Sequence, residues 1–443
     1  MQWRTVLRQI FFLAAPVCLI RVTIAATAAF DTAIAGRLSE IDLTGASLGI
    51  IVMSNLAMAA GTIASANVAM ISEARGEGRY ADAWMFLVQG IYVSVLLSLC
   101  LGGGVAALAF LPGSFELLGQ KFQEANVART YLIGILPGFP FILVFASLRY
   151  ALAAMGLSTT TLTWTIVGFG VNALTDVWFA FGGYGIPRLG AAGIGWASTV
   201  TYSVMCLGML VQLVCSAQWR FQATSRWNVN TAAIRRIFAE GWSIGVVTLA
   251  EVLLFIVAGL FSGTLGVLAA HQIAMDCLYF GFMIPSAIGE AAKILVGMNR
   301  GQRSNVAQII RVGLWLCVGY AVAVNVLVQT SPRALVSLFV RSEGDFTTVA
   351  NMAVLFLRIG GGYALFDSVQ IFSTGILRGF RDNNVASLIT VLCYLIGGVG
   401  SSYLLGLVWG FGGFGVWLGL VVGLATASAG LIWRVTYMLR RMM

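Results

Sequence analysis

Four acidic residues lie inside long apolar stretches of the sequence: Asp31, Asp176, Glu251 and Asp367. A charged side chain at the centre of a membrane-spanning helix costs about 2.5–3.5 kcal/mol on insertion scales, and the residues that carry this cost typically bind ions or transfer protons. The four carboxylates therefore predict cation sites. The cation is either a hard metal ion such as Na⁺, which prefers oxygen ligands, or a proton.

The first half of the chain offers several oxygen donors near its two aspartates. Asn172 and Asp176 are four residues apart, so they share one face of a helix. Asp31, at the end of an earlier apolar stretch, and either Ser198 or Thr199 complete an oxygen-rich set. We predict that these side chains form a cation or substrate site.

The second half of the chain offers a second set. Tyr363 and Asp367 are also four residues apart, and with Glu251 they predict another site for Na⁺ or H⁺. His271 is the only histidine and cannot build a metal site alone. We interpret His271 and its neighbour Gln272 as candidates for lining a cavity.

A plainer interpretation is that these carboxylates cap helix ends or face water, without a role in transport. It is strongest for Asp176 and weakest for Glu251 and Asp367, which long apolar stretches flank on both sides. The sequence alone leaves both interpretations open.

The stretches that must position these residues are long enough to cross a bilayer. Of the 443 residues, 59% are hydrophobic and only 10% are charged, against about 25% charged in soluble proteins. Because a span needs about 20 mostly apolar residues, we predict an all-α polytopic membrane protein of about twelve transmembrane helices. The expected spans are 9–34, 46–71, 83–111, 126–148, 158–182, 189–215, 236–262, 268–298, 307–331, 346–376, 383–406 and 411–438.

The two halves of the chain resemble each other at a nearly constant offset of 222–225 residues. The matches are Ala35-Gly36 with Ala258-Gly259, Arg75-Gly76 with Arg300-Gly301, Gly156 with Gly379, and Gly190 and Gly193 with Gly412 and Gly415. Internal repeats of this kind are typical of transporters. We predict two pseudo-symmetric six-helix lobes, 1–215 and 236–443, joined by a cytoplasmic linker over 216–235.

Basic residues are distributed unevenly between the loops. If the N-terminus lies inside, 17 Lys and Arg residues fall on the inner side and 6 on the outer side. The positive-inside rule then predicts that both termini are cytoplasmic. The same distribution explains the net charge of +9 without a nucleic-acid partner.

Several motifs resemble the multidrug and toxic compound extrusion (MATE) family, in particular its NorM-like branch. They are Phe-Asp-Thr-Ala-Ile-Ala-Gly at 30–36, Ala-Glu-Val-Leu-Leu-Phe around Glu251, Ala-Ala-His-Gln-Ile-Ala at 269–274, Asp-Ser-Val-Gln from Asp367, and Gly-Ile-Leu-Arg-Gly at 375–379. The resemblance covers nearly the whole chain. It implies a MATE/MOP-type fold and export of cationic or amphiphilic compounds in exchange for Na⁺ or H⁺.

The resemblance also implies roles for particular residues. It assigns a second-lobe cation site to Glu251, Tyr363 and Asp367, and a first-lobe site to Asp31, Asn172, Asp176 and Ser198. Glu73 departs from the pattern, because relatives commonly carry glutamine there. We further expect a monomer in the inner or plasma membrane that uses no cofactor.

The sequence also bears on three alternative functions. A lipid-linked precursor flippase of the same superfamily would want a cationic cavity, whereas the intramembrane charges here are mostly acidic. An intramembrane enzyme is disfavoured, because the sequence contains neither an H-E-x-x-H helix nor a G-x-S-x-G elbow. A channel would show flux without exchange.

Overall fold

The computed structural model describes residues 3–115, 122–183, 185, 187–216, 227–300, 302–338 and 347–441. Within these ranges, twelve helices are long and apolar enough to cross a membrane, which confirms the predicted polytopic all-α fold. Only helices satisfy every backbone polar group within a single segment, as lipid requires. Most of the predicted linker (217–226) lies outside the described residues, as do Lys121 and Arg341 of the charge count.

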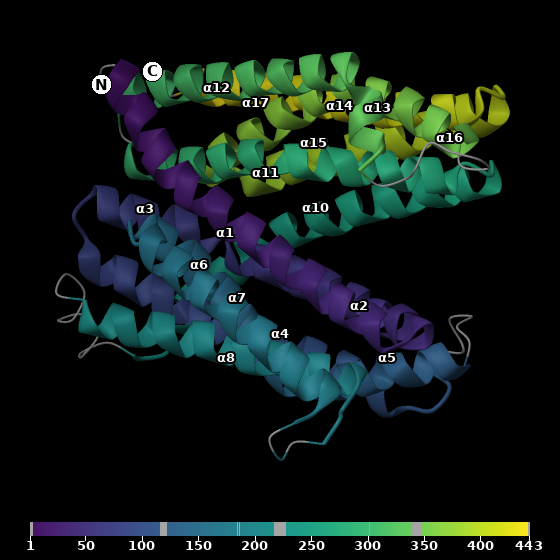
Figure 1. Cartoon of the computed structure of the whole chain (residues 1–443). Coiled ribbons are helices and arrows are strands. Elements are labelled where there is room, and N and C mark those ends of the chain that lie inside the picture. Colours follow the sequence, from purple (N-terminus) through teal and green to yellow (C-terminus); the bar gives the residue numbers. More distant parts are fainter. Residues whose placement is uncertain are drawn as a thin grey trace. The chain divides into compact units, whose positions relative to one another are not determined.

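The first half of the chain contains six spans (Figure 1). Its helices are α1 (Trp3–Leu38), α2 (Glu40–Ala64), α3 (Asn67–Gly76), α4 (Tyr80–Phe110), α5 (Phe122–Ile135), η2 (Leu136–Gly138), α6 (Phe139–Ala154), α7 (Ser158–Phe181) and α8 (Ala191–Cys215). The second and fourth spans are each built of consecutive helical pieces, α2 with α3 and α5 with α6.

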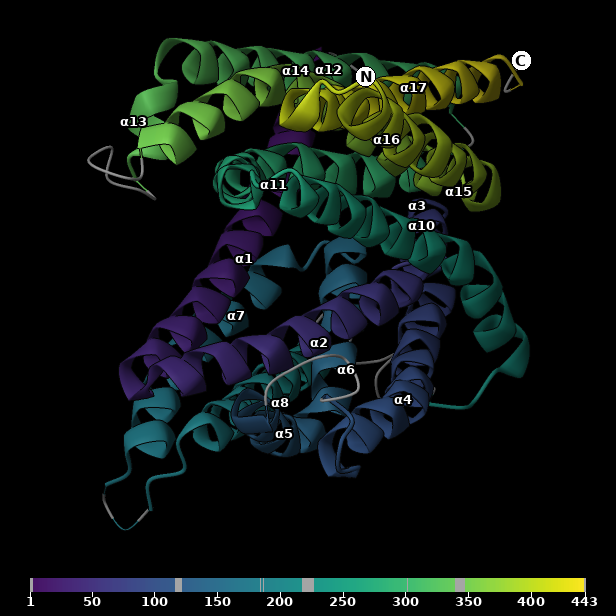
Figure 2. The same ribbon diagram turned by 90° about the vertical axis from the view of Figure 1, so that its right-hand side faces the viewer.

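The second half also contains six spans. Its helices are α10 (Thr231–Thr264), α11 (Leu268–Met298), α12 (Arg303–Thr330), α13 (Pro332–Val336), α14 (Thr347–Gly379), α15 (Asn383–Leu392), η4 (Cys393–Gly400), α16 (Ser401–Tyr403), η5 (Leu404–Val408) and α17 (Gly412–Arg441). The eleventh span, α15 to η5, includes two stretches of wider π-helix. Figure 2 shows α15 and α16 beside α17, against which both pack.

The chain forms two compact units. One is Leu19–Gly245, called here the first unit; the other, the second unit, is Met1–Cys18 together with Val246–Met443. Helices α1 and α10 are therefore each divided between the units. The predicted lobes differ from these units in two ranges. Residues 1–18 belong to the second unit, and residues 236–245 belong to the first unit.

Glycines bring helix backbones into direct contact in the first unit. A Cβ on Gly134 of α5 would collide with the carbonyl of Ala192 on α8, and a Cβ on Gly195 would collide with the carbonyl of Tyr131. Small residues at such crossings let membrane helices pack closely. This contact fixes which face of α8 is turned toward the interior of the unit.

Two residues of the sequence repeat meet at the end of α6. Gly156 has a φ of +83°, which favours glycine. The guanidinium of Arg75 lies against Gly156, and its Nη1 donates to the carbonyl of Ala154 at 3.0 Å. Arg75 and Gly156 therefore cap the C-terminus of α6, and both belong to the residue matches between the two halves.

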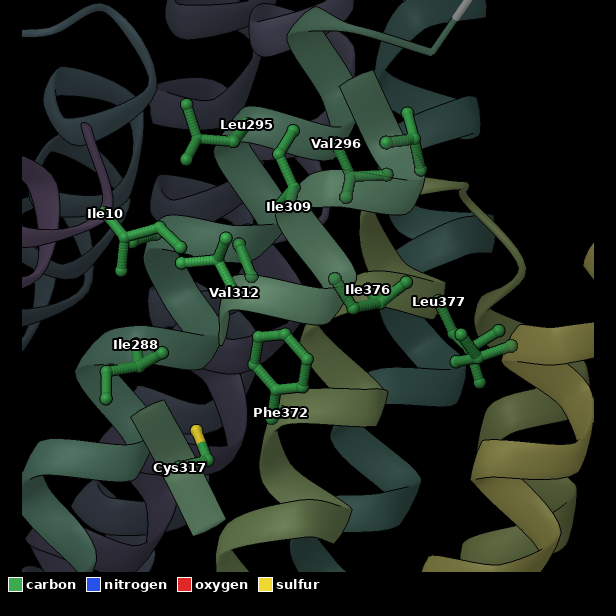
Figure 3. Packing of buried hydrophobic residues seen from close by; sticks show 14 of the residues in the cluster. Ile10, Ile288, Leu295, Val296, Ile309, Val312, Cys317, Phe372, Ile376 and Leu377 are labelled. Atoms are coloured by element: carbon green, nitrogen blue, oxygen red, sulfur yellow. The ribbon is translucent and has the colours of Figure 1, made fainter. Parts of the chain in front are cut away.

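Helix α14 is central in the second unit, where it packs on α11, α12 and α17. Figure 3 shows the apolar side chains that α11, α12 and α14 contribute to this core, with Ile10 of α1. The labelled residues are Ile10, Ile288, Leu295, Val296, Ile309, Val312, Cys317, Phe372, Ile376 and Leu377. At the α11–α14 crossing a Cβ on Gly375 would collide with the carbonyl of Gly289.

We therefore expect Gly375→Ala to destabilise the protein by about 1–3 kcal/mol, because the added methyl group forces two backbones apart. Gly362→Ala is the matched control on the same helix, since a Cβ there meets nothing within 4 Å. Thermal unfolding in detergent compares the two variants. Equal unfolding temperatures would contradict the close α11–α14 contact.

Candidate functional site

The structure brings the predicted first-half residues together inside the first unit. Asp31 lies on α1, Asn172 and Asp176 on α7, and Ser198 on α8. Asn172 Nδ2 donates to Asp31 Oδ1 at 3.0 Å, and Ser198 Oγ donates to Asp31 Oδ2 at 3.4 Å. Asp31 is only 6% exposed, and Asn172 and Asp176 are fully buried.

The sequence left Ser198 and Thr199 as alternatives, and the structure separates them. The Thr199 hydroxyl donates instead to the carbonyl of Gly134 at 2.8 Å. Adjacent residues on a helix point about 100° apart, so only one of them can face Asp31. The glycine contact between α5 and α8 decides that it is Ser198.

Asp176 is the least satisfied polar group of this cluster. Neither of its carboxylate oxygens accepts a hydrogen bond from any side chain or backbone group in the described part of the chain. Its carboxyl group adjoins that of Asp31. Nor does either aspartate form an ion pair with a described Lys or Arg. Two buried acids without a positive partner need a proton or a cation between them.

Two tyrosines adjoin this cluster that the sequence analysis missed. Tyr131 of α5 and Tyr202 of α8 both lie within electrostatic reach of Asp31. Tyr202 follows Ser198 by four residues, so the same-face rule applied to Asn172 and Asp176 would have found it. Tyr131 comes from another helix, and no sequence spacing points to it.

The predicted second-half residues also gather within one unit. Tyr363 and Asp367 of α14 are 7% and 5% exposed, and both lie within electrostatic reach of Glu251 on α10. Arg378, from the last turn of α14, and Tyr394 lie near Glu251 as well. Each cluster thus has a described arginine within electrostatic reach of one of its members, Arg149 near Tyr202 in the first and Arg378 near Glu251 in the second.

His271 and Gln272 lie in different environments. The His271 ring is 3% exposed and packs edge-on against Trp417, with 5.5 Å between ring centroids. Gln272 is exposed, and its Nε2 donates to Asp276 Oδ1 at 3.0 Å. Among the residues that the structure describes, no three His, Cys, Asp or Glu side chains cluster as metal ligands.

A family model described as MatE matches residues 16–178 and 243–404. The chain belongs to the MatE family. The two matched segments begin 227 residues apart, close to the offset of the internal repeat, so each half carries one copy of the family's unit.

Curated relatives match along nearly their whole length. "Probable multidrug resistance protein NorM" of Synechococcus sp. is 30% identical over 96% of this chain and 92% of the relative. The protein of the same name from Pseudomonas putida is 29% identical over 93% and 90%.

Solved structures share the fold at lower identity. The eukaryotic MATE transporter AtDTX14 superposes with a TM-score of 0.83 at 16% identity, with all of both chains covered. A MOP superfamily transporter from Pyrococcus furiosus superposes with a TM-score of 0.82 at 18% identity, over 97% of this chain and 96% of the other. These neighbours confirm the predicted MATE/MOP-type fold.

The geometry around Asp31 predicts unequal costs for its two donors. Asn172→Leu leaves Asp31 Oδ1 buried without its amide donor, which should lower the unfolding free energy by about 1–3 kcal/mol. Ser198→Ala should cost less, because its 3.4 Å contact is long for a hydroxyl donor. Thermal unfolding of the purified variants measures both. An Asn172→Leu protein as stable as the parent would contradict the Asp31–Asn172 contact.

Proposed function

We propose that this protein is a secondary active efflux transporter that exports cationic or amphiphilic small molecules in exchange for Na⁺ or H⁺. Membership of the MatE family and the names of its curated relatives support multidrug export. The observation that carries the proposal is the adjoining, buried pair Asp31 and Asp176, which has no positive partner among the described residues.

The mechanism follows from this uncompensated charge. In one state of an alternating-access cycle the carboxylates accept a cationic drug. In the other state Na⁺ or H⁺ competes for the same carboxylates, and the drug leaves. Exchange results because one set of charges cannot neutralise both cations at once. A membrane potential adds about 2.3 kcal/mol per charge per 100 mV to the inward movement of the coupling ion.

The two clusters need not contribute equally. Arg378 lies within electrostatic reach of Glu251, and Arg149 lies within reach of Tyr202. Asp31 and Asp176 adjoin each other, and neither forms an ion pair with a described Lys or Arg. We assign the main coupling site to the first unit. We assign an auxiliary site to the second unit, formed by Glu251, Tyr363 and Asp367.

The remaining assignments follow the sequence. The protein is placed in the inner or plasma membrane with both termini cytoplasmic, on the asymmetry of loop charges. It acts as a monomer, without a cofactor and without enzymatic activity. Its partners are the lipid bilayer and its small-molecule substrates.

The proposal predicts a graded response to neutralising each acid. In vesicles with a Na⁺ gradient and a pH gradient imposed separately, the parent should export a fluorescent cationic dye with one of them. Asp31→Asn and Asp176→Asn should abolish this gradient-driven export. Glu251→Gln and Asp367→Asn should slow it, because we assign these two acids to the auxiliary site.

Asp82→Asn is the control, because this carboxylate is exposed and pairs with Arg79 at 2.6 Å. It should export dye like the parent. If all four intramembrane variants kept both export and its ion dependence, the carboxylates would not be the coupling sites.

A further inference from the structure

The segment that leads into α10 is bound to α4 through one buried glutamine. Gln89 is completely buried, and its Nε2 donates to the carbonyl of Asn228 at 2.9 Å. The backbone N–H of Asn230 donates to Gln89 Oε1 at 3.0 Å. Both ends of one amide are thus used by the backbone of residues 227–230, about 140 positions further along the chain.

Other residues of α4 hold the same segment. Tyr92 donates its hydroxyl to the carbonyl of Trp227 at 2.6 Å, and the ring of Trp84 meets the Trp227 ring edge-on at 5.9 Å. Asn230 Nδ2 donates to the sulfur of Met85 at 3.4 Å. These contacts come from successive turns of α4, so the segment is held by several side chains along this helix rather than by one.

The bound segment sets the start of α10. Asn230 Oδ1 accepts from the backbone N–H of Ala233 at 3.0 Å, as a helix N-cap does, and its carbonyl accepts from Ile234 at 3.0 Å. The docked segment and the first turn of α10 therefore share Asn230. Any displacement of the segment would displace the beginning of the helix.

A second contact holds the next turns of α10 to the first unit. A Cβ on Gly241 would collide with the carbonyl of Ile63 on α2, and one on Gly245 would lie 2.8 Å from Ile63 Cγ1. Directly after Gly245 the helix passes into the second unit, and Glu251 follows six residues after Gly245. A single helix thus links the Gln89 contact to a proposed cation-binding carboxylate.

We propose that Gln89 is a positioning residue for transport, which keeps residues 227–245 docked on the first unit in every state of the cycle. Any conformational change in α10 is then confined to the part of the helix that follows Gly245. Glu251 lies in that part, so the change moves this carboxylate. Undocking is disfavoured, because it would leave a buried amide and two backbone groups without partners. The inference rests on the proposed transport function.

A cross-link tests this directly. Met85→Cys and Asn230→Cys are introduced into a chain whose seven native cysteines are replaced by alanine, and the two thiols are joined by a short bifunctional reagent. We expect the cross-linked protein to export dye at the rate of the unlinked protein. The proposal would be overturned if cross-linking abolished export. In that case a cleavable reagent should restore export once reduction breaks the cross-link.

The rate of cross-linking gives a readout that does not need export. At one fixed pH it should be the same with and without Na⁺ and with and without dye. The pH is held constant because the thiolate is the reacting form of cysteine, so the rate of any thiol reaction changes with pH. A several-fold fall under any of these conditions would show that the segment undocks. If the unlinked protein exported no dye under either gradient, the transport function would fail, and the cross-linking rate would still decide the docking.

Gln89→Leu tests the glutamine itself, because leucine fills similar space without forming either hydrogen bond. We expect maximal export to fall at least about fivefold, because both hydrogen bonds between the Gln89 amide and the segment are lost, and the ion concentration for half-maximal export to shift. The control is Gln212→Leu in the same unit, an exposed glutamine that accepts one hydrogen bond, from Trp164 Nε1 at 2.7 Å. Gln89→Leu behaving like this control would overturn the assignment, and if Gln89→Leu failed to fold, the cross-link would decide alone.

Discussion

A negative charge inside a bilayer must be compensated, and this protein places two adjoining ones where no described basic side chain pairs with them. Asp31 receives an amide and a hydroxyl donor, whereas neither oxygen of Asp176 receives any from the described residues. The described residues therefore do not compensate the negative charge of the pair. Whatever cation compensates it gains the energy that the protein leaves unsatisfied, and an ion and a drug can compete for that gain.

Holding two acids so close requires helices that approach one another closely. In the first unit, Gly134 and Gly195 let α5 and α8 touch through their backbones, which turns Ser198 toward Asp31. In the second unit, Gly289 and Gly375 do the same for α11 and α14, and α14 carries Tyr363 and Asp367. These four glycines thus set the packing of two helices that carry site residues, α8 with Ser198 and α14 with Tyr363 and Asp367.

The sequence was sufficient where the information is local. Hydropathy gave the twelve spans, and the four-residue spacing of Asn172 and Asp176 correctly placed both on one side of α7. It could not choose Ser198 over Thr199, because the rotation of α8 depends on its contact with α5. Tyr131, Arg378 and the division of α1 and α10 between the units likewise depend on tertiary contacts, which local patterns do not encode.

In the proposed mechanism the coupling ion and the drug bind the same carboxylates. Its most direct test is the equilibrium affinity of the purified protein for a fluorescent cationic drug, measured as Na⁺ and H⁺ are raised separately. We expect one of the two ions to weaken drug binding progressively, and Asp176→Asn to remove this dependence. A drug affinity that neither ion changes would contradict it.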